Sequence, residues 1–240
     1  MLFLMRDLEQ RTRFRQMMLA AAALLGLGIL ALTVASAGST SAHADNQAVS
    51  GTSLHTGELA PEDHTDLDRV SAYLSAMTDM QGNFLQVGPD GSLAEGKFYL
   101  RRPGRLRFEY KPPEQMLVVA DGTWVAVKDG FSAAQRYPLG ATPLGLLLQD
   151  HVNLAKEVKV LAVERQPGAL RIKLADKSGN APGDITLVFD EPSLQLRQWV
   201  VTDAQGLQTT VALRNIQSGI RADNALFVVK TEQRPDIGIR

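Results

Sequence analysis

Residues 97–113 alternate between apolar and polar side chains on either side of an Arg-Arg-Pro-Gly turn. After the turn, Leu106, Phe108 and Tyr110 fall on one face, and charged residues fall on the other. This period of two predicts an antiparallel hairpin with one apolar face. Because an apolar face has to be covered, the fold must supply either another layer of protein or a ligand.

The same alternation continues over most of the chain after Gly82. Turn signals such as Asp121-Gly122 and Pro167-Gly168 separate the segments. Many short strands with regular turns predict a large antiparallel sheet that is curved or barrel-like. The expected strands are 83–87, 95–101, 105–111, 116–120, 123–128, 134–138, 157–165, 169–175, 184–190, 194–203, 207–217 and 225–230.

Two segments are predicted to be helical. The first begins near Asp66, with Thr65 as its N-cap and Gly82 at its end, because four apolar residues follow a helical spacing: Leu67, Val70, Leu74 and Met77. The second runs from Thr142 to Gln149, with Pro143 at its first helical position. This second helix is short and very apolar, so it either fills the end of the sheet as core or covers a cavity on the concave face as a lid.

The N-terminal residues have the pattern of a secretory signal peptide. A basic start precedes an apolar run from Met17 to Ala35 and an Ala42-His43-Ala44 cleavage site. The expected organisation is a signal peptide at 1–44, a disordered tether at 45–64 and a single domain at 65–240. An uncleaved membrane anchor is the alternative, because the apolar run is long enough to span a bilayer.

Charge and composition exclude several classes of function. The net charge is −1, and removing residues 1–44, with four arginines and two acidic residues, would make it −3. Without a basic excess, nucleic acid is not an expected partner. The absence of cysteine excludes disulfides and thiolate sites.

Histidine offers no better prospect for catalysis. Of the four histidines, only His151 lies outside the signal peptide and the tether, and it lacks the partners that an activated nucleophile needs. We therefore expect no enzyme, no metal and no cofactor. A lipid hydrolase remains the enzymatic alternative, and it would need an activated serine or a metal.

Arg102 lies in the turn of the hairpin and has two interpretations. Most arginines at such a place are solvated. Alternatively, the planar guanidinium reaches backbone carbonyls at the end of the lid and holds it shut, by a few hydrogen bonds of about 1 kcal/mol each.

These segments, taken in order, resemble the LolA family of periplasmic carriers of outer-membrane lipoproteins. The resemblance rests on V-x-x-Y-L and M-Q-G-N-F at 70–84, G-K-F-Y-L-R-R-P-G-R-L-R-F-E-Y at 96–110, V-A-D-G at 119–122, Gln135, T-P-L at 142–144, L-V-F-D at 187–190, and V-T-D-A-Q-G with T-T-V-A-L at 201–213. It covers nearly the whole expected domain.

Membership would imply a mainly β (α+β) fold. Its open, strongly curved antiparallel sheet would be an unclosed barrel of about eleven strands, with a few helices covering the concave face as a lid. Acyl chains of a lipoprotein would lie in the apolar cavity between sheet and helices, and Arg102 would latch the lid. The expected cavity and lid residues are Leu106, Phe108, Met116, Thr142, Pro143, Leu144, Leu146, Leu147 and Leu148.

The resemblance also implies partners and a location. The protein would be a periplasmic monomer that receives cargo from an inner-membrane ABC-type lipoprotein-releasing transporter and passes it to an outer-membrane acceptor. A lipid or glycolipid shuttle of the same fold, or an envelope-stress-sensing domain, is the alternative.

Overall fold

A computed structural model describes residues 59–130 and 133–229. The expected signal peptide and most of the expected tether lie outside these ranges. Within them, eleven strands form one antiparallel sheet in the order β6-β5-β4-β3-β2-β1-β11-β10-β9-β8-β7. The strands are β1 Asp79–Val87, β2 Leu93–Arg101, β3 Arg105–Tyr110, β4 Met116–Asp121, β5 Trp124–Asp129, β6 Gln135–Pro138, β7 Val158–Gln166, β8 Ala169–Asp176, β9 Asp184–Asp190, β10 Leu196–Thr202 and β11 Gln208–Ser218.

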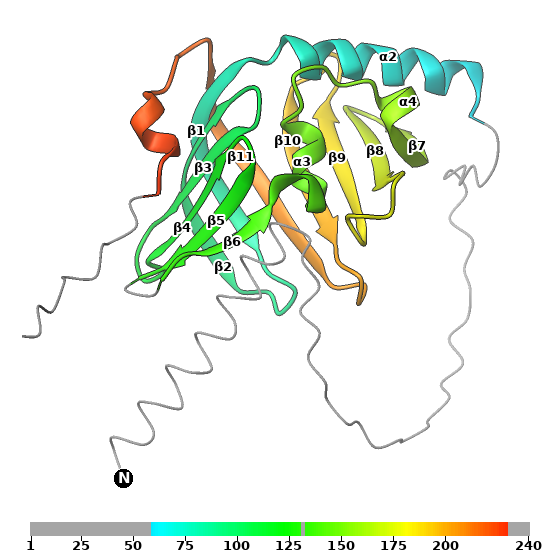
Figure 1. Ribbon diagram of the computed structural model, residues 1–240. Coiled ribbons are helices and arrows are strands. Elements are labelled where there is room, and N and C mark those ends of the chain that lie inside the picture. The colour runs from blue at the N-terminus through cyan, green and yellow to red at the C-terminus, as the bar shows by residue number, and fades with distance from the viewer. Residues whose placement is uncertain (1–58, 131–132, 230–240) are drawn as a thin grey trace, which may run out of the picture.

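The sheet curves into an open half-barrel with most of its helical segments on one side (Figure 1). The long helix α2, Pro61–Ala76, runs across the top, and the short helix α3, Pro143–Leu147, lies in front of the sheet. The remaining helical segments are the 3₁₀ helix η1 Leu139–Ala141, the helix α4 Leu154–Glu157 and the 3₁₀ helix η2 Asn224–Phe227. Among the described residues, no helix combines the length and the hydropathy needed to cross a bilayer.

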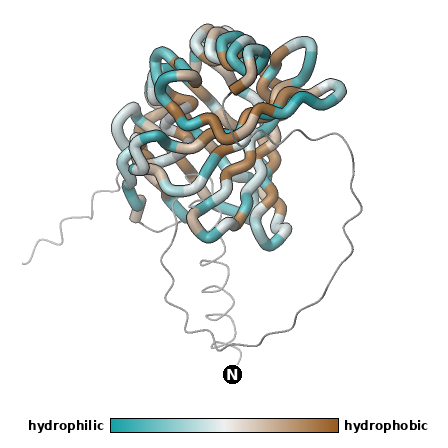
Figure 2. Tube along the Cα trace, turned by 90° about the vertical axis from the view of Figure 1, so that its right-hand side faces the viewer, coloured by the Kyte–Doolittle hydropathy of each residue, from teal (hydrophilic) through white to brown (hydrophobic). Residues whose placement is uncertain are grey.

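The concave face of the sheet forms the core. Inward-pointing residues alternate with outward-pointing ones along β2, β3, β8 and β9, and nearly all of the inward ones are buried, as the alternation predicts. Phe108 of β3 contacts Phe84 of β1 at 4.8 Å between ring centroids, and it reaches Trp199 of β10 at 6.1 Å. Because β3 and β10 are not neighbours in the sheet, this contact shows how strongly the face closes on itself. Apolar residues accordingly gather towards the middle of the fold (Figure 2).

A glycine in β2 makes room for this aromatic packing. A Cβ atom at Gly96 would lie 1.9 Å from the carbonyl oxygen of Glu109 and 2.7 Å from Cε1 of Phe84. Real Cβ atoms essentially never come so close, so only glycine fits without a shift of the backbone of β3.

The first helix differs from the prediction at both ends. It begins at Pro61, so residues 61–64 are helical and do not belong to a tether, and its N-cap is Ala60 and not Thr65. Proline at the first position suits a helix start, and the Asp63 carboxylate accepts a hydrogen bond from the Ala60 N–H at 3.0 Å. The helix ends at Ala76, and Gly82 lies inside β1.

The expected strand at 225–230 is also wrong. Residues 224–227 form η2, which starts where the Asp223 carboxylate accepts a hydrogen bond from the Ala225 N–H at 2.9 Å. This segment packs on the outer face of the sheet, where Phe227 and Ala222 bury Val119. The other expected strands all overlap observed ones, and the open antiparallel sheet with few helices confirms the predicted fold class.

Candidate functional site: a helical lid and its arginine

The side chain of Thr142 caps the N-terminus of the helix α3. The Thr142 hydroxyl accepts a hydrogen bond from the Gly145 N–H at 3.2 Å and donates one to the Leu139 carbonyl at 2.8 Å. Pro143 follows at the first helical position, as the sequence predicted. The backbone of Leu146 also lies in α3, but the side chains of Pro143 and Leu146 are outside what the structure describes.

The predicted cavity residues and the lid residues meet in one apolar cluster. Leu106, Phe108 and Met116 point from the sheet into the concave face, with at most 3% of each exposed. Three lid residues belong to the same cluster and are equally buried: Leu144, Leu147 and Leu148. The structure therefore shows α3 packed closed on the concave face.

A separate pocket of about 530 Å³ lies at the edge of the lid. Pro103 and Gly104 of the β2–β3 turn border it on one side, and Thr142, Gly145 and Leu148 of the lid border it on another. None of the sheet residues predicted to line the cavity borders this pocket. It therefore lies at the rim of the lid, where Asp176 and Ala181 also border it, and it is distinct from the predicted cavity.

Arg102 joins the lid, the long helix and the hairpin. From the turn between β2 and β3, its Nη1 donates to the carbonyl of Leu74 in α2, and its Nη2 donates to the carbonyl of Leu147 at the end of α3. Its backbone N–H donates to the Thr78 carbonyl at 2.7 Å. The next glycine adds another link, since the Gly104 N–H donates to the Leu148 carbonyl at 2.7 Å. Arg102 thus contacts backbone carbonyls of both helices, and its role as a latch stays a prediction.

The Arg102 guanidinium is buried, and desolvation disfavours its charged form. Only 9% of Arg102 is exposed, and desolvation lowers its pKa to about 10, against the opposing effect of the Asp150 charge. Arg102 is thus still charged at neutral pH, yet its two partners are neutral carbonyl groups. Hydrogen bonds to carbonyls near a helix C-terminus are favourable for a cation. They offset the free-energy cost of desolvation less than an ion pair with a carboxylate would. Arg102 therefore contacts both helices through hydrogen bonds to neutral groups.

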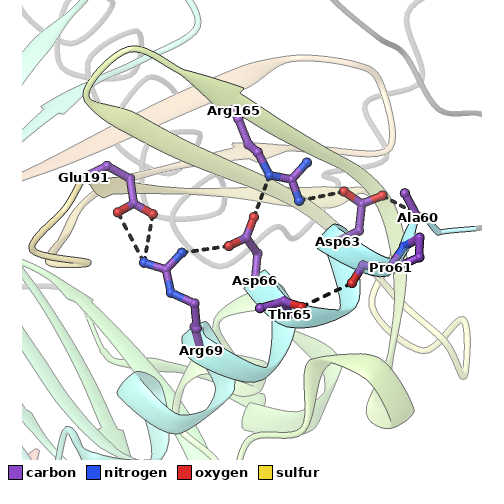
Figure 3. A network of polar contacts seen from close by, with 8 residues as sticks. All are labelled: Ala60, Pro61, Asp63, Thr65, Asp66, Arg69, Arg165 and Glu191. Atoms are coloured by element: carbon purple, nitrogen blue, oxygen red, sulfur yellow. Dashed lines mark hydrogen bonds and ion pairs between the residues drawn. The ribbon is translucent and has the colours of Figure 1, made fainter.

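An ion-pair network fixes the other end of α2 (Figure 3). Asp63 and Asp66 are both buried, and Arg165 of β7 reaches them with nitrogen–oxygen distances of 2.9 and 2.7 Å. Arg69 joins Asp66 at 2.7 Å to Glu191, in the β9–β10 turn, at 3.2 Å. The sequence analysis missed this network. The available signal was that Asp63 and Asp66 fall on the buried stripe of Leu67 and Val70 and so need a partner.

The described residues contain no group of three or more histidine, aspartate or glutamate side chains that could hold a metal ion. His151 is almost fully exposed, and its imidazole lies 3.8 Å from the Asp150 carboxylate.

The fold and the site together define a class: an open antiparallel half-barrel whose apolar concave face is covered by a helical lid. The model of the family described as "Outer membrane lipoprotein carrier protein LolA" matches residues 75–230, which is more than half of the chain. The chain therefore belongs to the LolA family, and the resemblance found in its sequence is confirmed.

Two sequence relatives agree with this assignment. The chain is 27% identical to an outer-membrane lipoprotein carrier protein of Methylococcus capsulatus over 181 residues, 71% of this chain and 86% of that protein. It is 29% identical to one of Legionella pneumophila (strain Corby) over 184 residues, 72% of this chain and 89% of that protein. A solved LolA superfamily protein from Nitrosomonas europaea is 9% identical with a TM-score of 0.42, covering 68% of this chain and 97% of that one.

Proposed function

We propose that this protein is a periplasmic carrier that encloses the acyl chains of lipoproteins and moves them from the inner to the outer membrane. The observation that carries the proposal is the link between Arg102 and the carbonyls of Leu74 and Leu147. It fastens a helical lid over an apolar sheet face by contacts that can be released. Family membership supports the same role.

The energetics of acyl chains fit this role. An exposed CH₂ group costs about 0.8 kcal/mol in water, so a carrier must cover the chains along their length. In the proposal, the lid moves off, and the chains take its place against Leu106, Phe108 and Met116. The lid segment Thr142, Pro143, Leu144, Leu146, Leu147 and Leu148 then covers them. Because such apolar contacts are non-directional, binding stays reversible.

The proposed partners follow from the same role. The carrier would receive cargo from an inner-membrane ABC-type transporter and pass it to an outer-membrane acceptor, as a monomer and without enzymatic activity. Export to the periplasm would use the segment 1–44. N-terminal sequencing of the mature protein is then expected to give Asp45 as the first residue, and a start at Met1 would show a retained anchor.

The test is co-purification from the periplasm. The protein is co-expressed with a tagged outer-membrane lipoprotein, and with the same lipoprotein carrying serine in place of its acylated cysteine as a control. The acylated form is expected to co-purify and the serine form is not. If neither co-purifies and depletion of the carrier leaves lipoprotein sorting intact, the proposal fails. Mass spectrometry of the extracted ligand distinguishes a lipoprotein from a free lipid or glycolipid.

A further inference from the structure

Four polar side chains interrupt the apolar concave face. Gln86 of β1 and Trp199 of β10 both pair with Val211 of β11, and Thr209 lies two residues before it on the same face. Tyr110 of β3 completes the group, because its ring contacts Phe84 on this face at 4.9 Å. At most 8% of each of the four side chains is exposed.

Two of these four side chains, Tyr110 and Gln86, are hydrogen-bonded to each other. The Tyr110 hydroxyl donates to Oε1 of Gln86 at 2.7 Å. Burial raises the pKa of Tyr110 well above its ordinary value, so this hydroxyl stays a donor at any physiological pH.

The other two polar atoms are buried without partners. Nε1 of Trp199 and Oγ1 of Thr209 have no hydrogen-bond partner within 59–130 and 133–229. The Trp199 and Phe108 rings make an edge-to-face contact across the half-barrel, so the indole lies inside the concave face and not on its outer side. Buried polar atoms in native proteins are nearly always hydrogen-bonded, so a pair of such atoms on one face calls for an explanation.

The chemistry of the two atoms limits what could satisfy them. The indole N–H is only a donor, and a hydroxyl is both a donor and an acceptor. Their common missing partner is therefore an acceptor oxygen. The hydrocarbon part of an acyl chain has none, whereas the ester carbonyl that links the chain to glycerol has two lone pairs.

We propose that Trp199 and Thr209 form a subsite for the ester carbonyl of a bound fatty acyl group. The inference rests on the proposed function, since it requires that acyl chains enter the concave face. It adds a polar anchor for the cargo, carried by the strands, to a surface that is otherwise mainly apolar. The lid can then open and close without breaking the contact that positions the cargo.

Intrinsic fluorescence offers a direct test. The chain has two tryptophans, and Trp124 is exposed in β5, so the variant Trp124→Phe leaves Trp199 as the only reporter. The probes are a dipalmitoyl-S-glyceryl-cysteine peptide, its dialkyl ether analogue without the ester carbonyls, and dioleoyl phosphatidylglycerol. A new hydrogen bond from the indole is expected to shift its emission to longer wavelength with an ester probe and not with the ether.

The affinity for the probes should differ in the same way as the fluorescence response. The ester peptide is expected to bind about fivefold tighter than the ether, the value of one net hydrogen bond. Thr209→Val keeps the shape of the side chain, removes the hydroxyl and is expected to reduce this preference. Thr209→Ser is the matched control and should retain it. The ester probe that gives the response, peptide or phospholipid, identifies the source of the acyl group.

Stability of the unliganded protein separates a binding role from a structural one. If Oγ1 of Thr209 is unsatisfied in the free protein, Thr209→Val should not lower its melting temperature. A lower melting temperature with an unchanged ester preference would show that a buried water satisfies the hydroxyl, and it would overturn the subsite. Equal binding of ester and ether by the wild type would also overturn it while leaving the carrier function standing. Binding of no probe at all would reject the carrier function itself.

Discussion

Arg102 is a desolvated cation held by two neutral carbonyls, which predicts an unusual response to its replacement. Replacing a buried charge by an apolar side chain removes the cost of desolvation together with the hydrogen bonds. We therefore expect Arg102→Leu to fold normally, with a change in unfolding free energy within about 2 kcal/mol. Its lid, held by apolar contacts and by the Gly104–Leu148 hydrogen bond without the Arg102 contact, should release cargo poorly. Transfer of a labelled lipoprotein to acceptor vesicles measures this, and unchanged transfer would contradict the latch.

The same hairpin supplies a control arginine. Arg105 lies three residues further on and donates to Oδ1 of Asn224 on the outer face at 2.7 Å. Arg105→Leu removes the same kind of charge without touching the lid, so its transfer rate should stay close to that of the wild type. A loss in both variants would indicate that the hairpin as a whole, and not the lid contact, was damaged.

The role of single residues could be predicted only in part. Alternation placed Leu106 and Phe108 on the inner face, because a strand imposes its period on every residue. It could not choose between a solvated and a latching Arg102, whose two carbonyl partners lie 28 and 45 residues away in the sequence. The choice came from the resemblance. Nothing in the pattern indicated that Trp199 and Thr209 would be buried without partners.

At the scale of elements, α2 is held by its acidic N-terminal half. Asp63 and Asp66 are buried, so Arg165→Ala would leave Asp63 with the Ala60 N–H and Asp66 with Arg69. We expect the variant to lose about 1–2 kcal/mol, less than a fully buried pair would, because the Arg165 side chain is itself 43% exposed. Urea unfolding measures the loss.

An exposed ion pair provides the comparison for that variant. Lys111 and Glu95 lie 2.8 Å apart, and about half of each side chain is in solvent. Lys111→Ala should therefore change stability by less than about 0.5 kcal/mol. If Arg165→Ala is no more destabilising than Lys111→Ala, the network does not anchor α2.

Elements were predicted well where a period defined them and poorly where it did not. The strands follow a period of two, and every observed strand overlaps an expected one. The first turn of α2 has no apolar stripe, only Pro61, Glu62 and Asp63, so the helix was expected to start too late. In η2, the apolar residues that suggested a strand instead pack on the outside of the sheet against Val119. Tertiary packing overrode the local pattern in both places.

At the scale of the whole molecule, the helices are fastened unequally to the two halves of the sheet. Strands β7–β11 hold α2 through Arg165 and through the Tyr73 hydroxyl, which accepts from the Leu196 N–H at 3.1 Å. Ser71 of α2 also accepts a hydrogen bond from the Leu154 N–H at 3.1 Å. Strands β1–β6 contact α2 and the end of α3 through the turn at 102–104. Opening should therefore begin at this turn and leave α2 on β7–β11.

Amide hydrogen exchange can show whether the turn at 102–104 opens before α2 leaves the sheet, because each of these contacts includes a specific backbone N–H. When the diacyl lipopeptide is bound, the Gly104 amide, which donates to the Leu148 carbonyl, should exchange about tenfold faster than in the free protein. The amides of Leu154 and Leu196 should keep their protection, since α2 and its partners move together. The Gly88 amide, bonded within its own turn to the Ser92 carbonyl, serves as an unaffected reference. Loss of protection at Leu154 and Leu196 together with Gly104 would instead mean that all the helices leave the sheet as one body.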